Sequence, residues 1–293
     1  MIHELKKAGR ICYRALRYAE KIIDVDISLL EIAKKVETYI LDKGGSLAFP
    51  VNISINEIAA HYTPIDDSIR IKEGDVVKID VGVHIDGWIS DSAITIEVKT
   101  DKYKKLIEAS REALNEVEKI LKKGIELWKI GEVIENKIKS YGFNPIYNLT
   151  GHKIDRWILH SDIQIPNFNN GSKKKIENGI YAIEPFATTG KGYVIGKGNS
   201  NILRLNKIKV YIRNHSIRKF IEEIRKEYKT LPFSKRWIIE KYGKEKAENI
   251  INYLKREKIL YEYPILVEQS KGIVSQFEHT FLINNGVLVI SRE

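Results

Sequence analysis

The chain of 293 residues contains a single cysteine, so it cannot form an internal disulfide bond. We expect this thiol, Cys12, to be buried and structural, because it lies among apolar residues at helical spacing. No apolar run approaches the length of a membrane span, and five basic residues among the first twenty interrupt any apolar core of a signal peptide. These absences favour a cytoplasmic protein without a membrane partner.

The basic residues that the chain has in excess lie in one segment. The net charge is +10, and residues 197–263 contain 18 Lys and Arg against 8 Glu, which accounts for the whole excess. A localised basic block is typical of a surface that meets a polyanion, and ribosomal RNA is one candidate. The alternative is a solvated, lysine-rich surface of the kind that thermophilic proteins carry.

A long hairpin is predicted over residues 75–98, where an Asp-Gly pair suited to a tight turn joins two β-branched runs. With a two-residue loop, Gly82 faces Asp91 and Asp80 faces Ala93. Asp80 and Asp91 are then diagonal neighbours on one face, roughly 7 Å apart, and like charges this close require a cation. We expect the glycine that faces Asp91 to leave a void where an ion can sit.

Helices and antiparallel strands recur in two halves of the sequence. The first half begins with an N-terminal helix and a second helix introduced by the capping box of Ser28 and Glu31. The stretch LAFPVNISINEIAAHYTP contains two prolines and is predicted as edge strand or loop. Amphipathic helices are predicted over residues 101–122 and 127–141. Strands follow in TGHKID, GIYAIEPFATTG and SQFEHTFLINNGVLVIS, which indicates an α+β fold whose curved sheet holds the site on its concave face.

The basic segment interrupts the second half. It reads as three short amphipathic helices followed by the strand-like run LYEYPILVE, an order that resembles a winged helix. We therefore predict a catalytic domain over residues 1–196 and 264–293, and an inserted helical subdomain over residues 197–263. Such a module can bind nucleic acid, but we favour a role as a wall of the substrate pocket.

Four carboxylates and one imidazole stand in the β-rich stretches: Asp80, Asp91, His152, Glu184 and Glu278. Carboxylate oxygens favour hard divalent ions, and an imidazole widens the choice to manganese, iron, cobalt or zinc. Four negative charges offset two divalent cations. The set therefore predicts a site for two divalent metal ions.

The segments AAHYTP, KIDVGVHIDGWISDSA, TGHKID, AIEPFATTGKG and QFEHT, in this order, resemble the signature segments of type II methionine aminopeptidases, which have the creatinase-like pita-bread fold. The resemblance covers essentially the full chain. It implies that the five residues above are metal ligands and that residues 197–263 are the helical insertion that distinguishes type II from type I. The absence of an N-terminal extension resembles the compact archaeal form.

The resemblance also implies an activity: removal of the initiator methionine from nascent polypeptides with a small second residue, by attack of a hydroxide that bridges two metal ions. Glu184 would move the proton of the water. His61 and His160 would stabilise the oxyanion and orient the amide. By the same resemblance, three residues line the methionine pocket: Phe49, Leu159 and Tyr263.

The loop after the ligand histidine departs from the family, whose members commonly have small or polar residues there. This chain has Lys153, Asp155 and Trp157. His279 follows a ligand on a strand and so points to the opposite face. The histidines predicted to be structural are His3, His84, His215 and His279.

Two alternative functions follow from the same residues. Xaa-Pro aminopeptidases and prolidases share the fold and the ligand set, but they usually carry an extra N-terminal domain and lack the helical insert. A non-catalytic relative that binds nucleic acid or ribosomes is the other alternative. We expect a monomer with at most transient ribosome contact and no stable nucleic-acid partner.

Overall fold

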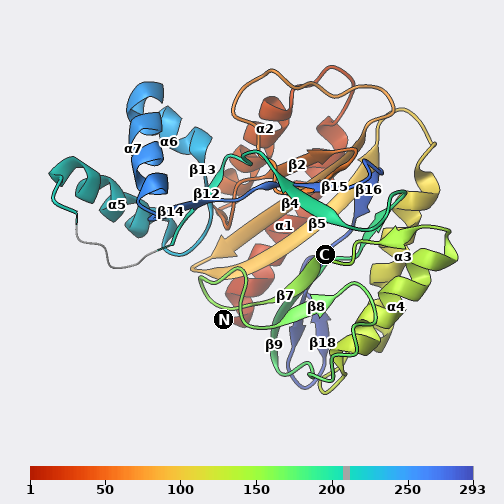
Figure 1. Cartoon of the computed structure of the whole chain (residues 1–293). Helices are drawn as coiled ribbons and strands as arrows, with labels where there is room; N and C mark the ends of the chain where they lie inside the picture. Colours follow the sequence, from red (N-terminus) through yellow and green to blue (C-terminus); the bar gives the residue numbers. More distant parts are fainter. Residues whose placement is uncertain (207–211, 293) are drawn as a thin grey trace.

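The computed structural model describes residues 1–206 and 212–292 (Figure 1). Two basic residues of the insert, Lys207 and Lys209, lie outside this range. In the part of the chain that is described, the helices are α1 (Ile2–Ile22), α2 (Leu29–Asp42), α3 (Lys104–Ile120), α4 (Leu127–Ser140), α5 (His215–Tyr228), α6 (Lys235–Tyr242) and α7 (Lys244–Arg256). None of these helices is both long and apolar enough to cross a membrane.

The strands of the described residues form five sheets, and every strand pair in them is antiparallel. The first contains β1 (Ser46–Leu47), β2 (Asn52–Ile55), β4 (Val76–Ile85) and β5 (Trp88–Glu97), and the second contains β6 (Asn144–Pro145), β10 (Phe186–Thr188) and β16 (Val274–Gln276). The third contains β3 (Ile58–Ala60), β11 (Val194–Lys197) and β15 (Ile265–Glu268), and the fourth contains β12 (Ile202–Leu205), β13 (Phe233–Ser234) and β14 (Leu260–Glu262). The fifth contains β7 (Thr150–Ile154), β8 (Gln164–Pro166), β9 (Gly179–Ile183), β17 (His279–Ile283) and β18 (Val287–Val289). The predicted α+β class is confirmed, with the strands of the site divided between separate sheets.

The predicted hairpin is present as β4 and β5, and its register is the predicted one. Asp80 is paired with Ala93, and Gly82 with Asp91. The expectation of a void beside Gly82 was wrong, because a β-carbon added to Gly82 would lie 2.2 Å from a ring carbon of Phe49. The missing side chain thus lets an aromatic ring pack on the strand and leaves no empty space there.

The N-terminal helices pack on this hairpin. α1 lies against β4 and β5, and α1 and α2 share their apolar core. Cys12 is fully buried in it, and its thiol donates to the carbonyl oxygen of Val81 at 3.1 Å, which confirms a structural role. Ser28 caps α2 by accepting from Glu31 N at 3.0 Å. The Glu31 carboxylate pairs with Lys35, at 2.6 Å, so the cap has one half of the predicted box.

The insert has a hydrophobic core of its own, formed by α5, α6, α7 and the sheet of β12, β13 and β14. Figure 1 shows these helices together at one side of the molecule, opposite α3 and α4. The predicted run LYEYPILVE is two strands: β14 pairs inside the insert, whereas β15 pairs with β11 and β3. A buried ion pair between Arg236 and Glu37, at 2.8 Å, joins α6 to α2. The proposed limits of the two domains stay a prediction.

Candidate active site

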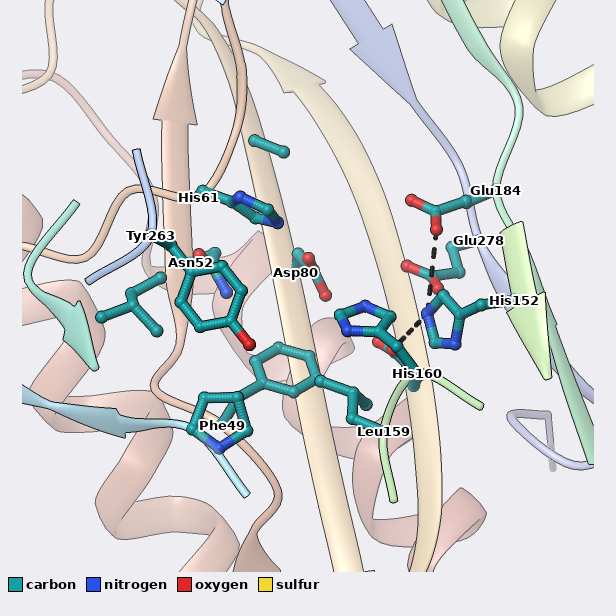
Figure 2. A pocket seen from close by; sticks show the side chains of 14 residues that line it. Phe49, Asn52, His61, Asp80, His152, Leu159, His160, Glu184, Tyr263 and Glu278 are labelled. Carbon is teal, nitrogen blue, oxygen red and sulfur yellow. Dashed lines mark ion pairs between the residues drawn. The ribbon is translucent and has the colours of Figure 1, made fainter. Parts of the chain in front are cut away.

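A cavity of about 60 Å³ lies between the hairpin and the later strands (Figure 2). The structure brings every residue of the predicted site to its wall: Phe49, His61, Asp80, Asp91, His152, Leu159, His160, Glu184, Tyr263 and Glu278. In Figure 2 the carboxylates and imidazoles converge on the cavity from several strands. Side chains up to 229 positions apart in the sequence therefore share one small space.

Hydrogen bonds that link β5 to Glu278 and to Thr280 of β17 fix two of these carboxylates. Ala93 and Glu278 form an isolated antiparallel bridge. Thr280 Oγ1 accepts from the backbone N–H of Asp91 and donates to the carbonyl oxygen of Asp91, both at 2.7 Å. Asp91 and Glu278 thus enter the cavity from backbone segments that are held rigidly to each other.

Four of the five predicted ligands have donor atoms within 4.8 Å of those of another. One ligand atom each of Asp91, His152 and Glu278 lies within 4.8 Å of the others. The Nε2 atom of His152 lies 3.5 Å from an oxygen of Asp91 and 3.8 Å from an oxygen of Glu184. Ligands about 2.0–2.2 Å from one ion have separations of this order. Asp80 lines the same cavity.

The electrostatics of these carboxyl groups fit a divalent cation. Within the described residues, no hydrogen-bond partner reaches Asp80 Oδ1 or Asp91 Oδ1, and both atoms are buried. Burial raises the pKa of Asp91 to about 7, and burial together with the charge of Asp91 raises the pKa of Asp80, Glu184 and Glu278 well above the usual range. Buried carboxylates that lack donors are costly unless a cation neutralises them.

Two more imidazoles face the cavity. His61 follows β3 with a φ of 61°, its ring packs edge-on against Tyr263 at 5.3 Å, and burial lowers its pKa to about 4. His61 is therefore neutral near pH 7 and able to donate through one ring nitrogen. His160 stands at the exposed rim, with its ring centre 4.2 Å from that of His152 (Figure 2).

The remaining histidines lie elsewhere in the fold. His279 points away from the ligands, as predicted, and its Nδ1 lies 2.9 Å from Ser291 Oγ. His84 is buried near the hairpin turn and accepts from Gly87 N at 3.2 Å. His3 and His215 are exposed at the surface, so the expectation that they have a structural role finds no packing contact to support it.

Sequence reasoning missed a polar residue behind the carboxylates and four residues of the cavity wall. Gln276 Nε2 lies 3.4 Å from an oxygen of Glu184 and 3.4 Å from an oxygen of Glu278. Its position two residues before Glu278 was a usable signal, because such residues share a face of an extended strand. The four missed wall residues had no signal of this kind: Asn52, Ala60, Ile202 and Pro232.

The whole chain is similar to known peptidases. The model of metallopeptidase family M24 matches residues 3–285. A methionine aminopeptidase of Pyrococcus horikoshii is 41% identical over 300 residues, which cover 100% of this chain and 99% of that protein. Similarity over the full length of both chains includes the insert as well as the strands of the site.

Solved structures agree with this result. A methionine aminopeptidase from Thermotoga maritima has a TM-score of 0.72 at 25% identity, covering 100% of this chain and 96% of that one. A thermophilic Arx1 has a TM-score of 0.86 at 17% identity, covering 99% and 90%, a likeness of fold alone. The predicted resemblance is confirmed, and the chain belongs to the methionine aminopeptidases of metallopeptidase family M24.

Proposed function

We propose that this chain removes the N-terminal methionine from proteins and peptides whose second residue is small. The observation that carries the proposal is the cavity itself, where four carboxyl groups and three imidazoles meet beside an apolar wall. Full-length similarity to methionine aminopeptidases supports the same reaction.

We further propose that two divalent metal ions, of cobalt, manganese, iron or zinc, are held by five side chains: Asp80, Asp91, His152, Glu184 and Glu278. The donor set and the unpartnered buried oxygens support this assignment. When bound, such ions supply Lewis-acid activation of water and of a carbonyl oxygen.

Other roles in the reaction fall to separate side chains of the cavity. Glu184 accepts a proton from the attacking water and returns it to the leaving amine. His160, at the rim, donates to the carbonyl oxygen as negative charge develops there, and neutral His61 orients the amide. Three residues form the apolar wall for the methionine side chain: Phe49, Leu159 and Tyr263.

Three peptides test the reaction on manganese-loaded protein. Met-Ala-Ser should be cleaved, N-acetylated Met-Ala-Ser should be inert, and Ala-Pro-Ala should be a poor substrate. Cleavage of the blocked peptide at a rate close to that of the free one would contradict an exopeptidase. Preference for Ala-Pro-Ala would favour an Xaa-Pro aminopeptidase, and tight RNA binding by metal-free protein would favour a non-catalytic relative.

We propose nascent polypeptides as the natural substrates, met in the cytoplasm by a monomer whose basic insert contacts the ribosome transiently. The excess of 18 Lys and Arg over 8 Glu in residues 197–263 supports the contact. Cosedimentation with ribosomes should be lost between roughly 50 and 200 mM salt, because phosphate contacts are screened in that range. Pelleting that resists salt would argue against a transient contact, and light scattering after gel filtration tests the monomer.

A further inference from the structure

The turn that follows His152 determines where two residues of the cavity lie. Asp155 and Ile158 close the turn through two backbone hydrogen bonds of 2.9 Å each. The next residues, Leu159 and His160, line the cavity. The position of the His160 ring therefore depends on what holds this turn.

Trp157, inside the turn, has a backbone conformation that costs free energy. Its φ is 64°, in the left-handed region that bulky side chains rarely adopt. Such a conformation persists only where surrounding contacts hold it, and it clusters at functional sites. The contacts of Trp157 come from two parts of the chain that are distant in the sequence.

The tip of the β4–β5 hairpin supplies the first set of contacts. The backbone N–H of Trp157 donates to the carbonyl oxygen of Gly87 at 2.9 Å, and a β-carbon on Gly87 would lie 2.4 Å from the indole ring. The Nε atom of Arg156 donates to the carbonyl oxygen of Asp86 at 2.9 Å. The ring of His84 packs edge-on against the indole at 4.7 Å. One side of the turn is thereby fastened to the hairpin that carries Asp80 and Asp91.

The insert supplies the second set, from the link between α5 and β13. Lys229 Nζ lies 3.5 Å from the centre of the indole ring, and Thr230 Oγ1 donates to the carbonyl oxygen of Trp157. Lys229 itself has a φ of 53°. The same link continues to Pro232, which lines the cavity. The insert thus touches both the turn and the pocket wall.

We propose that Trp157 is a positioning residue and that Lys229 holds it, so that the insert sets the place of His160 in the cavity. The proposal rests on the proposed function, in which His160 donates to the developing oxyanion. A group that acts mainly in the transition state affects kcat more than KM. Loosening the contact between Lys229 and Trp157 should therefore lower kcat.

The first test removes the charge of Lys229 and keeps its chain. Lys229 is exposed, so Lys229→Met is compatible with folding. With Met-Ala-Ser we expect kcat to fall roughly two- to fivefold, the range of an exposed cation–π contact, with KM nearly unchanged. Lys229→Arg should keep the wild-type kcat. The matched control is Lys226→Met, an exposed lysine in the last turn of α5, which should behave as wild type.

A second test asks whether Lys229 acts through His160. In a His160→Ala background, Lys229→Met should cause no further fall in kcat, because groups that act as one unit are not additive. Trp157→Leu should repeat the kcat loss, and Trp157→Phe should restore part of it. Melting temperature and metal content are measured for each variant.

The outcomes separate the two proposals. Multiplicative losses in the double variant, or an equal loss in Lys226→Met, would overturn the role of Trp157 and Lys229 and leave the proposed function intact. A His160→Ala variant with wild-type kcat would overturn the assigned role of His160 and this inference with it. A loss of kcat in Lys229→Met that is absent from Lys226→Met, and that does not add to the loss in His160→Ala, supports the inference.

Discussion

At the scale of single residues, Glu184 is the group on which the proposed chemistry depends most. It keeps 14% of its side chain exposed in the cavity, as a group that exchanges protons with substrate must. Glu184→Gln keeps the shape but cannot accept the proton of water. We expect kcat for Met-Ala-Ser to fall by about 10²–10⁴-fold, the usual contribution of general acid–base catalysis.

The control for this variant is Glu177→Gln, because Glu177 is an exposed glutamate outside the cavity. It should have the wild-type kcat. Metal content, measured by mass spectrometry, separates a lost proton acceptor from a lost ligand. A Glu184→Gln enzyme that holds its metal and works at the wild-type rate would exclude Glu184 as the proton shuttle.

His84 should make folding sensitive to acid. Burial, and then the nearby charge of Lys229, lower the pKa of His84 from 6.5 to about 4. Between pH 6.5 and pH 4 the unfolded chain binds more protons at His84 than the folded chain. The contribution of neutral His84 to the free energy of unfolding is therefore complete above pH 6.5 and is lost as the pH falls towards 4. It amounts to roughly 3 kcal/mol at most.

Urea unfolding of wild type and His84→Asn across this pH range measures the effect. The free energy of unfolding should fall less steeply with acid in the variant. Both proteins contain the same carboxyl groups in the cavity, so subtracting one curve of unfolding free energy against pH from the other cancels the contribution of those groups. Curves of equal slope would show that protonation of His84 does not change the free energy of unfolding.

At the scale of elements, Lys78 fastens β4 to two neighbouring segments. It is 1% exposed, and its ammonium donates to the carbonyl oxygens of Asn56 and Val274 at 2.9 Å each, and of Val76 at 3.4 Å. Lys78→Met removes these bonds, although Asn56 O still accepts from Val274 N and Val76 O still accepts from Asn56 N. We expect a loss of roughly 1–3 kcal/mol in the free energy of unfolding, the cost of a buried polar group that loses its partner, with removal of the buried charge offsetting part of it.

Chemical unfolding of Lys78→Met and of the exposed control Lys72→Met tests this role. The control should unfold with wild-type stability. Equal stability of all three proteins would mean that the carbonyl contacts contribute nothing net.

The elements also show where sequence reasoning succeeds. The Asp-Gly pair, Asp86 and Gly87, has φ angles of 48° and 81°, which suit the two-residue turn that set the register of β4 and β5. That register follows from local chemistry alone. The ring that fills the space beside Gly82 belongs to Phe49, and no local pattern places a loop side chain against a strand more than thirty positions away.

At the scale of the whole molecule, metal removal should destabilise the fold. The proposed ligands come from both halves of the chain, and one buried oxygen each of Asp80 and Asp91 has no hydrogen-bond partner among the described residues. An ion that binds only the folded state at 100 times its Kd adds about 2.7 kcal/mol. Calorimetry should show a lower melting temperature after chelation and recovery on adding manganese.

The matched variant for this experiment is Asp91→Asn, which removes one charge of the cluster. Its melting temperature should respond weakly to chelator and to added manganese. If neither chelation nor added manganese changes the melting temperature of the wild-type protein, a metal site of this kind is excluded.

Contacts between the insert and the rest of the chain could not be predicted from the sequence. The charge count located the insert, and the family resemblance named its type. Neither indicated that Lys229 and Thr230 meet Trp157, because this contact depends on how the insert core docks on the hairpin. The residue types of the site were predictable from motifs, and Gln276 could have been found from its spacing to Glu278, whereas the contact of the insert with Trp157 required the fold.

The hydrogen bonds between Thr280 and Asp91 have a consequence for the order of folding. They close a loop of almost two hundred residues, and closures of this length are slow because chain entropy opposes them. The hairpin alone carries only Asp80 and Asp91 of the five proposed ligands. We therefore expect high metal affinity only after the two halves have docked, and the rate at which refolding protein captures manganese should report this last step directly.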